Sequence, residues 1–135
     1  MIWLLDTNAW IDSLNKPAGP LVSRIFAHLP DVRICSIVKG ELWHGAEKSR
    51  RTVHREQLLT ALARFPSLPF DDAAARAFGK LRADLELPGQ RIGPYDLQIA
   101  AIALVHGATL VTHNTREFAR VSGLRVEDWQ VVGSS

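Results

Sequence analysis

The sequence has a single cysteine, no long apolar run and little net charge, and each shortage excludes a class of protein. Cys35 has no partner within the chain, which excludes a disulfide scaffold and a zinc site built from thiolates. The longest apolar stretch, Leu97 to Val105, is too short to cross a bilayer and contains Gln98. The first residues include no basic segment and reach Asp6 too early for a signal peptide, so we expect a cytoplasmic protein without membrane contact.

What remains is the composition of a folded domain. The chain has 135 residues, of which 47% are hydrophobic. Its 16 basic and 14 acidic residues are interspersed, so the composition excludes a disordered chain. This length suits one domain with a core of its own, which we expect over residues 1–132, followed by a frayed tail at 133–135. Of the 16 basic residues 12 are arginine, the side chain best suited to bidentate phosphate contacts.

Apolar strands alternate with helical patterns along the chain, which predicts an α/β fold. Met1 to Leu5 is apolar at every position and is typical of a central parallel strand. Further strands are expected at 32–35, 109–112 and 125–132, with a connector or short strand at 66–70. Helices are expected after Asp6 and at 21–29, 36–48, 50–64, 71–87, 94–107 and 115–121.

Two acidic residues, Asp6 and Asp96, lie where strands or helices begin or end. Asp6 directly follows the first strand, at the sheet edge where open α/β folds bind ligands. It could equally be the N-cap of the next helix. Asp96 lies in the first turn of a helix that is apolar nearly all round, where the helix dipole keeps a carboxylate ionised. An ordinary acid at a helix start is the alternative for Asp96.

A third acid, Glu41, flanks the apolar stripe of its helix. It comes four residues after Ile37 and three after Val38, so it is half-turned toward the core. Such a carboxylate needs a partner, unless it extends to solvent as a surface glutamate. If the three acids meet at one sheet edge, their repulsion requires a cation, and oxygen ligands favour Mg²⁺ or Mn²⁺. Such a site supports phosphodiester hydrolysis, whereas acids such as Asp128 are expected to be surface charges.

Four segments, in this order, resemble the PIN domain and, within it, the VapC-type toxins of toxin–antitoxin systems. They are LLDTNAWI at 4–11, SIVKGELWHGAEKS at 36–49, IGPYDLQIAAIALVHGATLVTHNTREFARV at 92–121 and GLRVEDW at 123–129. The resemblance implies a PIN-like three-layer fold, with a mainly parallel central sheet of about five strands flanked by helices. It also implies a ribonuclease dependent on Mg²⁺ or Mn²⁺ that cleaves structured RNA, such as tRNA or rRNA loops, and inhibits translation.

The same resemblance implies roles for individual residues. Asp6, Glu41 and Asp96 match the acids that act in catalysis and hold the metal ion. Where many PIN domains have a fourth acid, this chain has Asn114, a neutral residue that can still bind a metal ion or water. Glu117, one helical turn further, can complete the negative cluster instead.

Three neighbouring polar residues match the family as well. Thr112 resembles the hydroxyl that orients a site carboxylate or water. Thr7 and Asn8 match the family's DTN word, and we expect Asn8 to support the turn at Asp6 rather than to bind metal.

Possible RNA contacts come from basic residues near these segments. Arg50 and Arg51 belong to a basic tract at a helix–helix junction that could follow a phosphate backbone or simply be a solvated face. Lys39 precedes Glu41 by two residues, and Arg116 lies close to Asn114. The resemblance further implies a homodimer and a VapB-type antitoxin that wraps the toxin, with DNA contacted only through that antitoxin.

Two other functions fit parts of the pattern. A phosphatase of the haloacid dehalogenase type also has a nucleophilic Asp after an apolar first strand, but it generally needs a second Asp where this chain has Asn8. A non-catalytic PIN-fold module that binds RNA or protein is favoured by Asn114. It is disfavoured by the three clustered acids, which would destabilise a fold that has no use for them.

Overall fold

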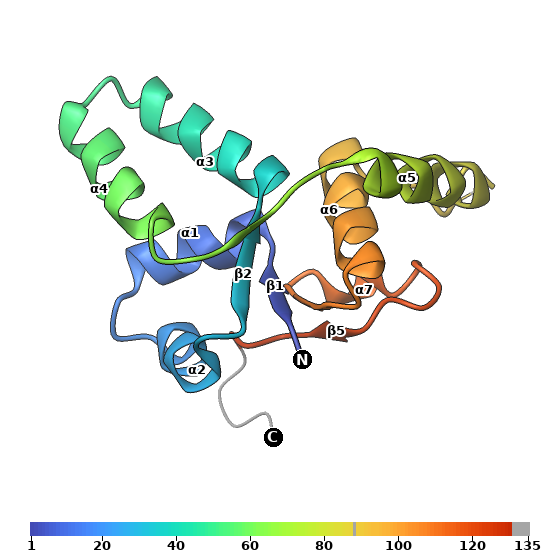
Figure 1. Ribbon diagram of the computed structural model, residues 1–135, viewed down its shortest axis with the longest axis horizontal. Helices are drawn as coiled ribbons and strands as arrows, with labels where there is room; N and C mark the ends of the chain where they lie inside the picture. Colours follow the sequence, from blue (N-terminus) through green and yellow to red (C-terminus); the bar gives the residue numbers. More distant parts are fainter. Residues whose placement is uncertain (88, 131–135) are drawn as a thin grey trace.

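The structure, a computed structural model, describes residues 1–87 and 89–130 (Figure 1). In this part of the chain five strands form one parallel sheet in the order β3-β2-β1-β4-β5. The strands are β1 (Trp3–Leu5), β2 (Val32–Cys35), β3 (Ser67–Leu68), β4 (Thr109–Val111) and β5 (Val126–Glu127). The helices are α1 (Thr7–Asn15), α2 (Pro20–His28), α3 (Ser36–Lys48), α4 (Thr52–Leu62), α5 (Asp72–Leu85), α6 (Pro94–Val105) and α7 (Thr115–Phe118). The predicted α/β fold with a parallel sheet flanked by helices is therefore confirmed.

The strand order places a change of direction between β1 and β4. From β1 the chain moves outward through α1 and α2 to β2, and then through α3 and α4 to β3. It returns through α5 and α6 to β4, on the other side of β1, and continues outward through α7 to β5. Figure 1 shows the α3–α4 hairpin and the α5–α6 pair on opposite sides of β1. Open α/β sheets bind ligands beyond the carboxyl ends of the strands at such a switch point.

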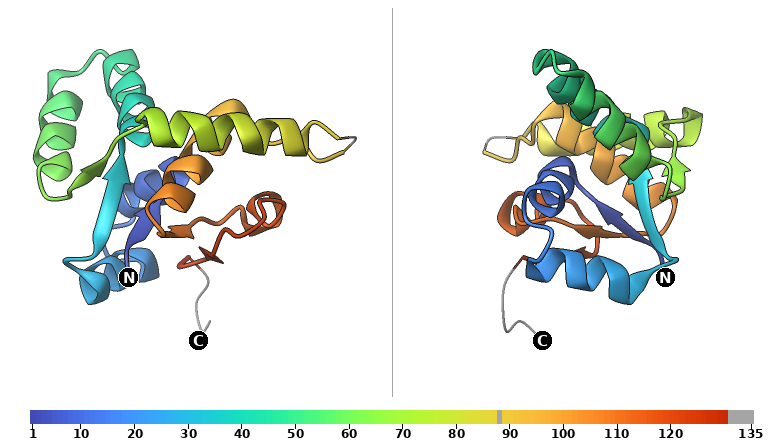
Figure 2. Two further views of the ribbon diagram at one scale, coloured as in Figure 1. Left: turned by 45° about the vertical axis from the view of Figure 1, so that its right-hand side comes forward. Right: turned by 90° about the vertical axis from the view of Figure 1, so that its left-hand side faces the viewer.

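The core lies on both sides of the three central strands. Leu4, Ile34 and Leu110 are fully buried, as expected for strands covered on both faces. Helix α6 is buried almost all round between the sheet and α5, which packs along it (Figure 2). Its small side chains, Ala100 and Ala103 among them, allow this close packing. The position of Asp96 in the first turn of α6 is therefore fixed by a rigid element.

Several predicted boundaries were wrong. The helix expected at 50–64 is Thr52–Leu62, because Arg50 adopts a φ of 58° that separates it from α3. The helix expected to be capped by Asp71 and to reach about Leu87 is indeed capped by Asp71, but it ends at Leu85. The strand expected at 125–132 covers only Val126–Glu127, and residues 131–135, including the expected tail, lie outside the described residues. None of the described helices is long and apolar enough to cross a membrane.

Candidate active site

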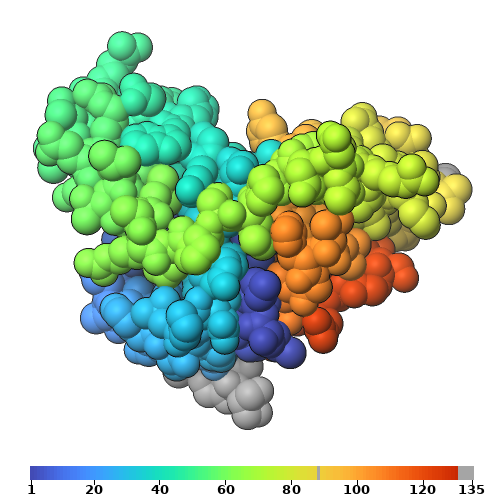
Figure 3. All heavy atoms as spheres, in the orientation of Figure 1, coloured from blue at the N-terminus to red at the C-terminus, as the bar shows by residue number. Residues whose placement is uncertain are grey.

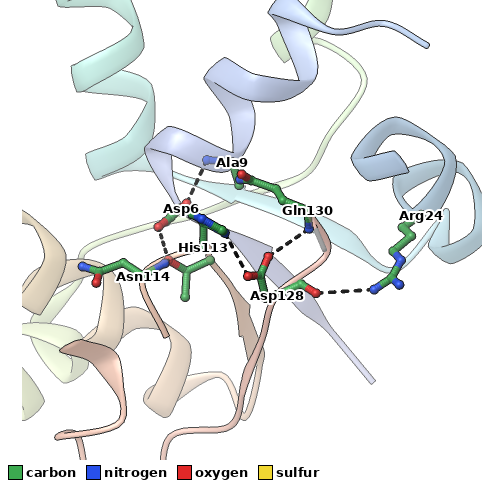
Figure 4. A network of polar contacts seen from close by, with 8 residues as sticks. Asp6, Ala9, Arg24, His113, Asn114, Asp128 and Gln130 are labelled. Carbon is green, nitrogen blue, oxygen red and sulfur yellow. Dashed lines mark hydrogen bonds and ion pairs between the residues drawn. The ribbon is translucent and has the colours of Figure 1, made fainter. Parts of the chain in front are cut away.

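Asp6 joins the end of β1 to the start of α1. Its Oδ1 accepts a hydrogen bond from the Ala9 amide at 2.9 Å, so it is the N-cap of α1. Its Oδ2 accepts a hydrogen bond from the Thr112 hydroxyl at 2.5 Å. Figure 4 shows the carboxylate between these two contacts, at the switch point of the sheet. The two alternatives for Asp6 are therefore compatible, since one oxygen caps the helix and the other faces β4.

Thr112 follows β4 and links Asp6 to the next segment. Its side chain is fully buried, and its hydroxyl accepts a hydrogen bond from the Asn114 amide at 3.0 Å while donating to Asp6. The Asn114 side chain in turn donates to Glu117 Oε2 at 2.7 Å. Glu117 Oε1 accepts from the Gly93 amide at 3.4 Å, just before α6. Asn114 thus holds Glu117 against the start of the helix that carries Asp96.

Glu41 has its partner on the first turn of α1. The Thr7 hydroxyl donates to Glu41 Oε1 at 2.6 Å, across a sequence separation of 34 residues. Both side chains are half-buried. The Thr7 hydroxyl therefore supplies one hydrogen-bond donor to the Glu41 carboxylate, which was expected to need a partner because it flanks the apolar stripe of α3.

The four carboxylates act on one another electrostatically, and we call Asp6, Glu41, Asp96 and Glu117 the acidic cluster. Burial, and after it the charges of the other three carboxylates, raise the pKa of Asp96 to about 6. Burial also raises the pKa of Asp6, against the hydrogen bonds from Thr112 and Ala9, while the charge of Glu41 adds to the rise. The fold therefore concentrates negative charge where it is costly to ionise.

Within residues 1–87 and 89–130, no basic side chain forms an ion pair that neutralises this charge. Among the described residues, the ion pairs involve other acids and leave out every member of the acidic cluster. Nor do any three His, Cys, Asp or Glu side chains in residues 1–87 and 89–130 form a group that could hold a metal ion as they stand. Carboxylates are hard oxygen ligands of the kind that Mg²⁺ prefers, so an ion bound by one or two of them would keep several of its waters.

Sequence reasoning missed Asp128, which was expected to be an ordinary surface charge. Its side chain is only 17% exposed, and its Oδ2 lies 2.9 Å from His113 Nδ1 (Figure 4). Its charge also raises the pKa of Asp6. The signal was available, because Asp128 directly follows β5 at the same edge of the sheet where Asp6 follows β1.

Other predicted residues lie around this cluster. Asn8 is exposed on the first turn of α1, and the turn at Asp6 is closed by the Ala9 amide, so support of the turn by Asn8 stays a prediction. Arg50 and Arg51 lie at the junction of α3 and α4, as expected, beyond the end of α3, which is roughly 10 Å along the helix from Glu41. Lys39 is two residues from Glu41 on α3 and so does not share its face.

Arg116 is the basic residue nearest the site in the sequence. It is exposed on α7, next to the Asn114–Glu117 pair. It is therefore available to an anionic ligand that reaches the acidic cluster.

Two cavities adjoin the acidic cluster. One, of about 400 Å³, is lined by Asp6, His113 and Asn114 among others. The second, of about 530 Å³, is lined by Glu41 and by Tyr95, the neighbour of Asp96. An extended ligand lying across the cluster would therefore find space on both sides of the carboxylates.

The raised pKa of Asp96 predicts a pH-dependent stability difference. Because its pKa rises from 3.8 to about 6 on folding, its contribution to stability is lost as pH increases between these values. In EDTA, Asp96→Asn is therefore expected to melt a few degrees above the parent at pH 7.5, and this gap should close toward pH 4.5. Thermal melts of both proteins at the two pH values measure it. Equal melting temperatures at pH 7.5 would show that the ionised carboxylate of Asp96 does not lower the stability of the fold.

The chain was compared with known proteins. A family model described as PIN domain matches residues 3–124. A relative from Shigella flexneri, named tRNA(fMet)-specific endonuclease VapC, is 40% identical over 129 residues, covering 94% of this chain and 97% of the relative. Ribonuclease VapC2 of Rickettsia felis is 36% identical over 132 residues, with 96% and 98% covered.

Solved structures are similar over the same length. A chain in the crystal structure of VapBC2 from Rickettsia felis, bound to a DNA fragment from its promoter, has a TM-score of 0.87 and 34% identity, covering 96% of this chain and 99% of that one. A chain of VapBC-1 from nontypeable Haemophilus influenzae also has a TM-score of 0.87, with 31% identity and 97% and 100% covered.

Proposed function

The chain belongs to the PIN domain family and to its VapC ribonuclease toxins, and on this premise we propose that it is a metal-dependent endoribonuclease that cleaves structured RNA and inhibits translation. The observation that carries the proposal is the acidic cluster at the switch point, which no described basic side chain neutralises. A fold gains nothing from such a cluster unless a cation binds to it.

Asp6, Glu41 and Asp96 would hold Mg²⁺ or Mn²⁺, and their chemistry fits these ions. All three are carboxylates, and each is set on a different rigid element: the end of β1, α3 and α6. A bound ion would polarise the phosphodiester and lower the pKa of a water molecule that attacks phosphorus.

Neighbouring residues of the chain orient the carboxylates through hydrogen bonds. The hydroxyl of Thr112 and the amide of Ala9 donate to Asp6, and these bonds favour its ionised form against the cost of burial. Thr7 orients Glu41, and Asn114 orients Glu117 near Asp96. The negative charge that repels RNA in the free protein is thereby organised to bind a cation first.

We propose tRNA as the RNA, since the Shigella relative is named a tRNA(fMet)-specific endonuclease. Expression of the chain without an antitoxin in bacterial cells is expected to arrest growth. Sequencing of RNA 5′ ends should then show a few new tRNA cuts, which are absent when Asp6→Asn is expressed at the same level. Arrest by Asp6→Asn with the same cuts would contradict the assignment.

A VapB-type antitoxin is the proposed protein partner, since the similar solved chains come from VapBC complexes. An apolar groove of about 550 Å³ runs between α1, α2 and α4. Phe26, Leu14 and Val53 line it and are 63%, 49% and 42% exposed. The indole Nε1 of Trp10, which also lines the groove, is buried and finds no acceptor within the described residues. Exposed apolar grooves of this kind are typical of protein interaction sites.

Phe26→Ser is expected to weaken binding of the cognate antitoxin by about 30-fold, as for an aromatic side chain at the centre of an interface. Leu59→Ser is the matched control, because Leu59 is equally exposed at 63% but does not line the groove. Calorimetry with the purified antitoxin measures both. Equal losses for the two variants would mean that the groove is not the interface.

The two other candidate functions lose support. Membership of the PIN family separates the chain from phosphatases of the haloacid dehalogenase type, as the absence of an acid at Asn8 already indicated. A non-catalytic module would have no use for the acidic cluster, and the relatives that cover nearly the whole chain are named ribonucleases.

A further inference from the structure

The cavity on the α3 side of the acidic cluster has a distinct chemistry. It lies between α1, α3 and α6, and its volume of about 530 Å³ is in the range of sites for small organic ligands. In the space-filling view a notch separates the α3–α4 lobe from the α5–α6 lobe (Figure 3). None of the described side chains that line the cavity is lysine or arginine, so the cavity is not built to bind a phosphate.

The walls of the cavity carry two aromatic side chains. Tyr95 is 59% exposed at the start of α6, although tyrosine is large and the middle of this helix is buried. His44 is exposed on α3, one helical turn after Glu41. Both line the cavity, together with the apolar side chain of Ile37. Exposed aromatic side chains beside a nuclease centre are suited to stacking on unpaired bases.

Gly40 leaves room between these walls. It lines the cavity from the middle of α3, where glycine costs helix stability relative to alanine. A Cβ added at Gly40 would meet no atom within 4 Å, so the space above it is open. A side chain at this position would therefore begin in open space and extend into the cavity.

We propose that this cavity is a base-binding subsite, which receives one unstacked nucleobase next to the phosphodiester that is cleaved. The inference rests on the proposed cleavage of RNA. Tyr95 and His44 supply the stacking surfaces, and the hydroxyl of Ser36 lies among the lining groups that can contact a base edge. Because Glu41 lines the cavity and Tyr95 directly precedes Asp96, a base held there belongs to a nucleotide adjoining the acidic cluster.

The subsite explains how a compact toxin could select a loop in a structured RNA. A base inside a duplex is stacked and paired, whereas a base in a loop can turn out into a pocket at much lower cost. Recognition by stacking tolerates different bases, so this subsite selects unpaired RNA more than a particular sequence.

The first test fills the cavity from its glycine side. Gly40→Leu is expected to raise KM for an RNA oligonucleotide spanning the tRNA cut by at least about 10-fold, with little change in kcat. Gly45→Leu is the matched control, since Gly45 lies on the same helix, has equal free space for a Cβ and does not line the cavity. Both variants replace a helical glycine and should melt no lower than the parent.

The second test removes the stacking surface. The oligonucleotide carries 2-aminopurine in place of each base beside the cut in turn. Its fluorescence is measured with protein in Ca²⁺, which can offset the charge of the acidic cluster and, because its coordination is looser than that of Mg²⁺, is expected to support no cleavage. One position should be quenched by the parent, unquenched by Tyr95→Ala, and quenched again by Tyr95→Phe. An abasic nucleotide at that position should weaken binding to the parent about 10-fold and to Tyr95→Ala hardly at all.

The possible outcomes separate the two proposals. If the parent cuts no RNA and quenches no position, the proposed function fails and the subsite with it. If the parent cuts RNA, but Gly40→Leu and Tyr95→Ala keep its KM and quenching, the ribonuclease stands and the subsite is refuted. A raised KM in Gly40→Leu alone, with Gly45→Leu unaffected and quenching dependent on Tyr95, supports the subsite.

Discussion

Asp96→Asn is expected to lower kcat/KM for RNA cleavage at least about 10³-fold, a loss of about 4 kcal/mol of transition-state stabilisation. The change removes one negative charge from the acidic cluster while keeping the size of the side chain. Asp96 is half-buried in the first turn of α6, and three other carboxylates raise its pKa. The asparagine also removes the repulsion within the acidic cluster, so the variant should lose activity while the fold becomes more stable at neutral pH.

This combination distinguishes a functional acid from a structural one. Cleavage of the mapped tRNA and thermal melts are measured on the same preparations of parent and variant. Asp84→Asn is the control, because Asp84 is an exposed acid paired with Lys80 on α5. If Asp96→Asn retained a tenth of the parent's activity, Asp96 would not belong to the centre that cleaves RNA.

Thr112→Val is expected to lower cleavage by about 10- to 100-fold and the free energy of unfolding by about 1–3 kcal/mol. The fully buried hydroxyl of Thr112 donates to Asp6 Oδ2 and accepts from the Asn114 amide. Valine keeps the shape of the side chain and leaves the buried Asp6 carboxylate and the part-buried Asn114 amide without this partner. Burial already raises the pKa of Asp6, and the loss of the donor raises it further, which weakens the binding of a cation.

Two further substitutions make this result specific. Thr112→Ser keeps the hydroxyl and should recover most of the cleavage lost in Thr112→Val. Thr109→Val is the control, because Thr109 is another buried threonine and is the first residue of β4. Its hydroxyl makes only a weak hydrogen bond, to Met1 Sδ at 3.7 Å, so this change should leave cleavage unchanged. Full activity of Thr112→Val, measured at saturating Mg²⁺ and again at limiting Mg²⁺, would contradict the role of the hydroxyl.

The sequence predicted the elements that have a strong local signal. The apolar run at 1–5, the long pattern at 36–48 and the buried helix at 94–107 each bury a face that the chain itself specifies. The short strands were harder, because β3 and β5 have only two residues each and are defined by their neighbours in the sheet. The expected strand at 125–132 was too long, since Asp128 accepts from the Gln130 amide and turns the chain.

Asp6 and Asp96 were singled out because each lies at the start or end of an element, and Glu41 because it flanks an apolar stripe, where a charge is unusual. Their partners could not be predicted from such local patterns, and only the family resemblance pointed to Thr112 as a hydroxyl that orients a carboxylate. The bond from Thr7 to Glu41 and the bond from Thr112 to Asp6 join segments separated by 34 and 106 residues. Only the tertiary fold brings such groups together, and the pairing of Asp128 with His113 arises in the same way.

The most direct measurement of metal-dependent ribonuclease activity uses a total tRNA pool and the antitoxin-free protein. New 5′ ends are mapped after incubation with Mg²⁺, with EDTA, and with Asp96→Asn in Mg²⁺. A few discrete cuts in Mg²⁺ are expected, and they should be absent under the other two conditions. Cuts that persist in EDTA or with Asp96→Asn, or a folded parent that cuts no tRNA in Mg²⁺, would contradict the proposed activity.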